Sequence, residues 1–152
     1  MHITPLDPQS AAVQALIAQS DAYMAALYPA ESNHLESTTA LSQPNVLFVG
    51  AHIEGELAGC GAVKTMDDDG RYGEIKRVFV LEQHRGKGLS KAIMQTLEAH
   101  LQATGVRLAR LETGIHQPEA LGLYARLGYV LREPYGGYAH DPLSVFMEKT
   151  LA

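Results

Sequence analysis

The stretch Val78–Leu101, "VFVLEQHRGKGLSKAIMQTLEAHL", carries the strongest structural pattern in this chain. An apolar, strand-like segment leads through a short basic turn into a helical pattern. There Leu89, Ile93, Leu97 and Leu101 recur every four residues and form an apolar stripe that would pack on a sheet. The stretch therefore predicts a strand, a glycine turn and a helix in succession.

The turn has the features of an anion site. Gly86 and Gly88 let backbone amides face outward at the positive end of the following helix, an arrangement that suits phosphate groups. Arg85, Lys87 and Lys91 add local positive charge to a chain whose net charge is −5. We therefore expect an anionic ligand at the turn.

Two common phosphate motifs fail on spacing. A P-loop needs a hydroxyl residue after its lysine, but glycine follows Lys87. The dinucleotide fingerprint needs a third glycine where Lys91 stands. The pattern that remains is Gln/Arg-x-x-Gly-x-Gly/Ala. Its positions in this chain are Gln83, Gly86 and Gly88, and in part Arg85, Gly88 and Ser90.

Length and composition narrow the class of protein. With 152 residues and 46% hydrophobic content, we expect one domain over residues 1–152. No apolar run reaches the roughly 18 residues that cross a bilayer, and "MHITPLDPQS" has no signal-like pattern, so the prediction is a soluble, cytoplasmic protein without a membrane partner. The lone Cys60 fits a reducing compartment.

Charge and histidine spacing argue against two further partners. The net charge of −5 would repel a phosphate backbone, so nucleic acid is not expected as a partner. No two of the seven histidines stand four residues apart, and Cys60 is near none of them. The sequence predicts no metal site.

Strands and helices alternate along the chain. We expect a short strand around Ile3 and a helix that Asp7 caps, with Pro8 at its first position, ending near Tyr28. The stretch "ESNHLESTTALSQP" is expected to form a loop or a short irregular helix. Strands follow at "VLFVGAHI", "LAGCGAVKTM" and "YGEIKRVFV", then the helix after Gly88, the strand "VRLARLET", the helix "PEALGLYARLG" and the strand "SVFMEKT". This order predicts an α/β or α+β domain around one sheet.

The strand "YGEIKRVFV" contains most of the polar candidates. A period of two places Glu74, Lys76, Val78 and Val80 on one face. The other face receives Ile75, Arg77 and Phe79.

The strand, "QHRGKGLS" and the helix together resemble the acetyl-CoA-binding motif of the GNAT family of N-acetyltransferases. Downstream, "QPEALGLYARLGYV" resembles the second signature of the family, an alanine, a tyrosine four residues on, and Gly-Tyr four residues later. Upstream, "EIKRVFV" resembles the strand that diverges from its neighbour. The likeness covers roughly Val46–Lys149. Within the family, the chain resembles a bacterial branch whose members are described as small-molecule acetyltransferases.

The resemblance implies the GNAT fold, a mixed sheet of about six or seven strands flanked by about four helices. Its fourth and fifth strands, here about Tyr72–Val80 and Leu108–Thr113, would splay apart and admit the pantetheine arm of acetyl-CoA. The backbone of Phe79 or Val80 would hold the acetyl carbonyl, and the turn would wrap the pyrophosphate. The residues implied for the cosubstrate are Phe79, Val80, Gln83, Arg85, Gly86, Lys87, Gly88, Leu89, Ser90, Lys91, Gln117 and Tyr124.

Acetyl transfer to an amine needs a base, because an alkyl ammonium must lose a proton before it attacks. Glu74 is the first candidate by resemblance, with a salt bridge to Lys76 or Arg77 as its alternative role, and Glu112 is a second carboxylate. Tyr124 matches the family tyrosine that protonates the coenzyme A sulfur, with helix packing as its alternative. Gln117 stands where many family members carry Asn.

The acceptor would lie between two segments, "LYPAESNHLE" and "REPYGGYAHDPLS". Arg77 and Arg132 would suit an acceptor carboxylate. The candidate acceptor residues are Ser32, His34, Arg77, Tyr135, Tyr138 and His140.

The predicted function is direct transfer of an acetyl group from acetyl-CoA to a primary amine of a small molecule in a ternary complex. Two alternatives stay open, a protein N-terminal or lysine acetyltransferase and a non-catalytic acyl-CoA-binding sensor. Dimers are common among small domains of this kind, although no sequence feature fixes an interface for a homodimer.

Overall fold

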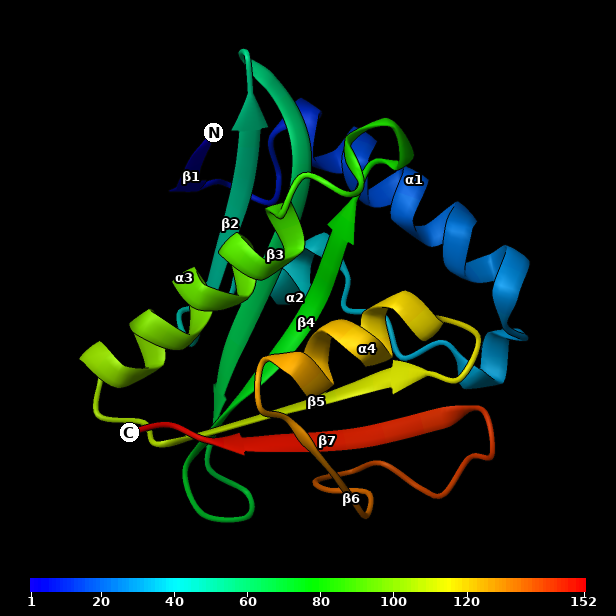
Figure 1. Cartoon of the computed structure of the whole chain (residues 1–152), viewed down its shortest axis with the longest axis vertical. Helices are drawn as coiled ribbons and strands as arrows, with labels where there is room; N and C mark the ends of the chain where they lie inside the picture. Colours follow the sequence, from blue (N-terminus) through cyan, green and yellow to red (C-terminus); the bar gives the residue numbers. More distant parts are fainter.

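A seven-stranded sheet forms the centre of the computed structural model, which describes residues 1–152 (Figure 1). The strands are ordered β1-β2-β3-β4-β5-β7-β6. All neighbours pair antiparallel except β4 and β5, which pair parallel. Their bounds are β1 (His2–Pro5), β2 (Val46–Ile53), β3 (Glu56–Met66), β4 (Tyr72–Val80), β5 (Leu108–Gly114), β6 (Val130–Arg132) and β7 (Ser144–Thr150).

Helices cover both faces of this sheet (Figure 1). On one face α1 (Ala11–Leu27) and α2 (Thr38–Leu41) pack in a common apolar cluster, and on the other face α3 (Leu89–Ala103) and α4 (Pro118–Arg126) contribute to the larger core. Short 3₁₀ turns span Ala30–Ser32 and Glu82–His84. The predicted mixed sheet with about four helices is confirmed.

The predicted stripe on α3 is the centre of the larger core. Ile93, Leu97 and Leu101 are each 0% exposed. They lie against Gly61 and Gly73 of the sheet, where glycine leaves room for branched side chains. The close approach of α3 to the sheet therefore depends on small residues in β3 and β4.

The start of α1 differs from the prediction. The helix begins at Ala11 with Ser10 as its N-cap. Asp7 instead closes a turn, since its Oδ1 accepts a hydrogen bond from the Gln9 amide at 2.9 Å. The Asp-Pro pair forms an Asx turn before the helix, a role that its composition suits equally well.

The predicted alternation in β4 is wrong beyond Lys76, because the strand contains a bulge. Arg77 has a φ of 57°, and the pairing moves from Ala62↔Lys76 to Cys60↔Phe79. Two residues of β4 thus oppose one of β3, which reverses the facing of every later side chain. Arg77 now shares the α1 face with Lys76, and Val78 packs toward α3.

Pairing between β4 and β5 ends early. Their parallel register runs only from Gly73↔Ala109 to Ile75↔Leu111. Beyond these pairs β4 stays bonded to β3, and β5 stays bonded to β7 as far as Gly114↔Ser144. Figure 1 shows the two strands diverging from this point. The sheet therefore opens at its middle, next to the end of β4.

None of the helices combines the length and the apolar character that a membrane-spanning helix needs.

We predict that Gly61→Ala lowers the free energy of unfolding by about 1–3 kcal/mol, because a Cβ there would overpack the core. That atom would lie 2.5 Å from Cγ2 of Ile93, a branched side chain with little freedom to move. Urea unfolding monitored by circular dichroism measures the change. Gly137→Ala is the matched control, since its Cβ would meet no atom within 4 Å. Equal stability of the two variants would contradict the packing argument.

Candidate active site

The glycine turn leads directly into α3. Gly86 and Gly88 have φ values of +79° and +80°, which favour glycine, and a Cβ at either position would point into open space. Gly88 is the N-cap of α3, and no side chain caps that helix end. Free amides and the helix dipole therefore face an open surface, as the anion-site prediction requires.

A groove of about 470 Å³ joins the turn to the gap between β4 and β5. Most of the residues that the resemblance implied for the cosubstrate line it. They are Phe79, Val80, Arg85, Gly86, Gly88, Leu89, Ser90, Lys91, Gln117 and Tyr124. Gln83 and Lys87 are exposed and lie outside the lining. Lys87 Nζ instead contacts His84 Nδ1 at 3.1 Å.

Arg85 connects the turn with α1. Its Nε donates to the Val80 carbonyl at 3.2 Å, and its guanidinium lies 4.9 Å from the centre of the Tyr23 ring. Tyr23 also packs near Phe79, with 6.1 Å between ring centres. The residue that was predicted to hold phosphate thus also fixes the wall between the turn and α1.

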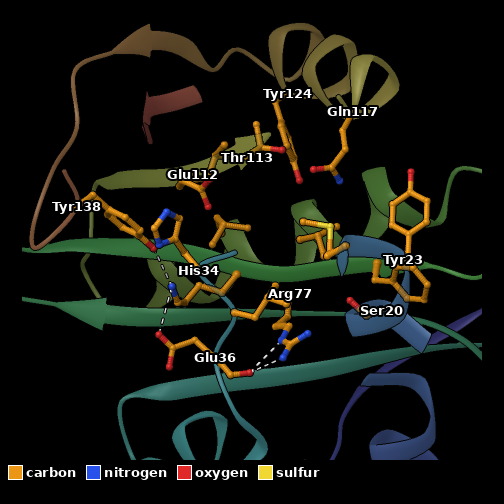
Figure 2. A pocket seen from close by; sticks show the side chains of 17 residues that line it. Ser20, Tyr23, His34, Glu36, Arg77, Glu112, Thr113, Gln117, Tyr124 and Tyr138 are labelled. Carbon is orange, nitrogen blue, oxygen red and sulfur yellow. Dashed lines mark hydrogen bonds and ion pairs between the residues drawn. The ribbon is translucent and has the colours of Figure 1, made fainter. Parts of the chain in front are cut away.

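A second, smaller cavity of about 90 Å³ lies beyond the groove, on the α1 face of the sheet. Figure 2 shows side chains from β4, β5, α1, α4 and two loops pointing into it. Its polar lining residues are Ser20, Tyr23, His34, Glu36, Lys76, Arg77, Glu112, Thr113, Gln117, Tyr124 and Tyr138.

The two cavities share part of their walls, namely Tyr23, Val78, Phe79, Gln117 and Tyr124. Tyr124 points from α4 into the small cavity beside Gln117 (Figure 2). Burial, with a smaller contribution from the charge of Glu112, raises the pKa of Tyr124 to about 12. The phenol therefore keeps its proton at neutral pH and faces the junction of the two cavities.

Glu74, the first candidate for the base, is held in a buried network outside the small cavity. It is 5% exposed, and its Oε2 accepts hydrogen bonds from the hydroxyls of Tyr135 at 2.9 Å and Tyr138 at 2.7 Å. Its Oε1 lies 3.4 Å from Lys76 Nζ, the pairing that its alternative role predicted. All of these contacts satisfy the carboxylate within the protein.

Glu112, the second candidate for the base, lies at the small cavity, whereas Glu74 does not. It is half-buried, lines the small cavity and points into it from β5 (Figure 2). Burial raises the pKa of its carboxyl, while the Ser144 hydroxyl and then the charges of His34 and Lys76 partly oppose this shift. A carboxylate with a raised pKa at an open position is suited to accept a proton.

Arg77 and Arg132 are both engaged within the protein. The Arg77 guanidinium bonds Asp21 Oδ1 at 2.5 Å and the Glu36 carbonyl at 2.7 Å and 2.9 Å. Arg132 Nη1 bonds Glu148 Oε1 at 2.6 Å, outside the small cavity. Both predicted partners of an acceptor carboxylate are thus already paired, and Arg77 ties the loop before α2 and helix α1 to the bulge.

The remaining acceptor candidates divide into two groups. His34 and Tyr138 line the small cavity, with 5.1 Å between their ring centres. Ser32 bonds Asp141 Oδ2 at 2.6 Å, Tyr135 is buried against Phe146, and His140 is exposed. None of these last three lines the cavity.

Sequence reasoning missed several lining residues. Tyr23, His84, Leu123 and Arg126 belong to the groove, and Ser20, Met24 and Glu36 belong to the small cavity. Arg126 could have been found as the basic residue two positions after Tyr124. For the α1 residues the apolar periodicity predicted only core packing, so no signal pointed to the site.

Comparisons with known proteins agree with this geometry. Residues 13–129 match the acetyltransferase (GNAT) family. An IAA acetyltransferase from Azospirillum brasilense is 42% identical over 95% of this chain and 94% of its own length. A Klebsiella pneumoniae protein assigned as an acyl-CoA N-acyltransferase superposes with a TM-score of 0.82 at 38% identity, over 99% of this chain and 97% of its own. The chain belongs to the GNAT family.

A third similarity concerns the ligand. PaiA N-acetyltransferase from Thermoplasma acidophilum, solved in complex with coenzyme A, has a TM-score of 0.74 at 18% identity over 99% of both chains. The predicted family, fold and N-acetyltransferase class are confirmed. No cluster of three or more His, Cys, Asp and Glu side chains could hold a metal ion.

We predict that Arg77→Ala lowers the free energy of unfolding by about 2 kcal/mol, because a buried, fully bonded guanidinium is lost. Amide hydrogen exchange at residues 33–36 should also accelerate, since their tether to β4 is gone. Arg71→Ala, at an exposed arginine, is the control. If both variants behaved alike, the tether would have no energetic role.

Proposed function

We propose that this protein transfers the acetyl group of acetyl-CoA directly to a primary amine of a small molecule. The observation that carries the proposal is the junction of a long groove with a small cavity at Tyr124. A groove for one substrate that opens into a separate cavity for the other is the arrangement that a ternary complex needs.

The groove suits acetyl-CoA in its backbone and its charge. The edge of β4 beyond Ile75 has no partner strand toward β5, so an extended pantetheine arm can bond to it as an added strand would. Lys91 and Arg126 place positive charge along the groove near the turn. When bound, acetyl-CoA supplies the activated thioester carbonyl, and backbone amides of β4 are the groups that would polarise it.

Glu112 is the proposed base. The acceptor reaches the cavity as an ammonium ion at neutral pH and must lose a proton before it attacks. Glu36 pairs with Lys76 at 3.2 Å and Asp21 pairs with Arg77, so Glu112 is the carboxylate of the cavity without an ion-pair partner. Its negative charge also attracts the cationic amine.

Tyr124 is the proposed proton donor to the departing sulfur. Its phenol lies where the groove meets the cavity, and its raised pKa keeps the proton in place until negative charge develops on the thiolate. Gln117 shares this wall and bonds Tyr28 through its Oε1 at 3.1 Å. The longer Gln117 side chain is thus held beside Tyr124 by Tyr28, the residue that follows α1.

The small volume of the cavity, about 90 Å³, favours a small amine over a protein acceptor. Glu36 and Tyr138 both contact Lys76 across it, and Arg77 holds the loop that contributes Glu36. A peptide segment would need an open groove at this position. A compact amine without a carboxylate fits these charges, because Glu112 has no ion-pair partner and Arg77 is already paired with Asp21.

Turnover of an amine panel tests this proposal. Ethylamine, ethanolamine, phenethylamine, glycine and a lysine-containing tetrapeptide are each mixed with acetyl-CoA, and free thiol and acetylated product are measured. We expect turnover of the small amines without carboxylate and little of the tetrapeptide. Preference for the tetrapeptide would support a protein acetyltransferase. Tight acetyl-CoA binding by calorimetry with no turnover would support a non-catalytic binding domain, and both outcomes would overturn the proposal.

We predict that Glu112→Gln lowers kcat by about 100-fold, the usual contribution of a general base. In the wild type, kcat/KM should fall as pH drops through the carboxyl pKa of Glu112, which burial raises, because protonation removes the base. The variant should lose this acidic limb. Glu74→Gln is the comparison, and an unchanged pH profile in Glu112→Gln with a lost limb in Glu74→Gln would return the role to Glu74.

We predict that Tyr124→Phe lowers kcat by about 100-fold, because the departing thiolate loses its proton donor. The ring keeps its packing in the variant, so the affinity for coenzyme A measured by calorimetry should stay within about twofold. Tyr129→Phe, at a tyrosine bonded to Glu98 Oε2 at 2.8 Å away from the junction, serves as the control. Full activity of Tyr124→Phe would leave Tyr124 with a packing role only.

A further inference from the structure

The hydroxyl group of Tyr28 lines neither cavity, but it contacts a residue that lines both of them. Tyr28 is 5% exposed, and its hydroxyl oxygen lies 3.1 Å from Oε1 of Gln117. Gln117 belongs to the wall that the groove and the small cavity share, and Figure 2 shows its side chain beside Tyr124. A buried hydroxyl therefore contacts the side chain that stands where the two cavities meet.

The local sequence fixes the position of the Tyr28 ring. A residue before proline avoids the helical conformation, so α1 ends before Pro29 and Tyr28 is extended, with φ −136° and ψ 148°. The ring packs on Gly114 of β5, where a Cβ would overlap the Tyr28 hydroxyl. It also stacks on the ring of His116, with 5.3 Å between the ring centres. These contacts hold the hydroxyl group in one place.

The hydrogen bonds of this hydroxyl determine how the Gln117 amide is turned. The backbone N–H of His116 donates to the Tyr28 oxygen at 3.1 Å, so the hydroxyl proton needs an acceptor elsewhere. Oε1 of Gln117 is that acceptor. With the amide turned over, its hydrogens would point at an oxygen that already accepts a bond, and the buried hydroxyl proton would lose its partner. Oε1 therefore faces Tyr28, and Nε2 faces away from it.

The Nε2 group of Gln117 is not used within the protein. Gln117 is the N-cap of α4, but its side chain does not cap that helix. The side-chain bond of Gln117 is the one that its Oε1 accepts from Tyr28, so the two N–H donors of Nε2 remain free. The residue is half-buried, and Nε2 is not a fully buried atom. Two oriented donors are therefore available at the wall that both cavities share.

We propose that Tyr28 is a positioning residue, which turns the Gln117 amide so that its N–H donors meet a carbonyl of the pantetheine arm. This inference rests on the proposed binding of that arm in the groove. The carbonyl groups of the arm lose water when they enter the groove, and an unpaired carbonyl there would cost affinity. The free edge of β4 offers backbone groups on one wall, and Gln117 offers donors on the wall formed by α4. Tyr28 acts through Gln117.

Calorimetry with two ligands tests the role of Tyr28. Acetyl-CoA carries the arm, whereas 3′-phospho-ADP is the nucleotide part of coenzyme A without it. Tyr28→Phe keeps the ring and removes the hydroxyl, so the Kd for acetyl-CoA should rise about fivefold, the usual effect of one hydrogen bond. The Kd for 3′-phospho-ADP should stay within about twofold. An equal loss for both ligands, or no loss for acetyl-CoA, would overturn the proposal.

Two further variants control this measurement. Tyr72→Phe also removes a buried hydroxyl, one that bonds Asp68 Oδ1 at 2.7 Å, and it should change neither Kd. Gln117→Met keeps an unbranched side chain but has no N–H donor, so it should weaken acetyl-CoA about as much as Tyr28→Phe does. In the Gln117→Met background, Tyr28→Phe should have no further effect, because the group that it positions is gone. Additive losses would leave Tyr28 with a packing role and overturn the proposal.

Nitrogen-15 NMR observes the Gln117 donors directly. The side-chain NH₂ signals of Gln117, assigned with Gln117→Met, should shift when acetyl-CoA is added and stay unchanged with 3′-phospho-ADP. Unchanged signals at saturating acetyl-CoA would overturn the contact with the arm. Neither measurement needs an acceptor amine. Failure of the amine panel would therefore overturn the acetyltransferase proposal while these binding results stood, and unaltered binding in Tyr28→Phe with full turnover would overturn only the role of Tyr28.

Discussion

The bulge at Arg77 is the constraint on which the site depends. By placing Arg77 and Lys76 on the same face of β4, it gives the strand two adjacent cations toward α1 and the loop before α2. The same bulge lies just beyond Ile75, where β4 and β5 stop pairing. This one backbone irregularity thus lies both at the opening of the sheet and in the wall of the small cavity.

Charge pairing then decides which groups remain for chemistry. Lys76 is neutralised by Glu36 and Glu74, and Arg77 is neutralised by Asp21. The hydroxyls of Tyr135 and Tyr138 donate to Glu74, and Tyr138 also lines the cavity. A buried ion pair adds little net stability, but these contacts hold the loop that contains Glu36 against β4. Among the acidic and basic side chains that line the cavity, Glu112 and His34 take no part in these ion pairs.

The sequence predicted the elements well where periodicity was strong. The bounds of β2 and β4 match the predicted strands, and the α3 stripe forms the core, because apolar spacing reports directly on burial. It failed at Arg77, since a bulge depends on pairing across strands and leaves no periodic trace. Among the site residues, the turn glycines and Tyr124 were predicted from local motifs, whereas Tyr23 of α1 was not.

The sequence by itself determined the family and the glycine turn, because these depend on neighbouring residues within single motifs. Only the tertiary structure decided which carboxylate faces the small cavity. Glu74 and Glu112 are equivalent in the sequence, each a glutamate on a central strand. Contacts from Tyr135 and Tyr138, which stand 61 and 64 residues further along the chain, bury Glu74 together with Lys76, and they leave Glu112 without such contacts.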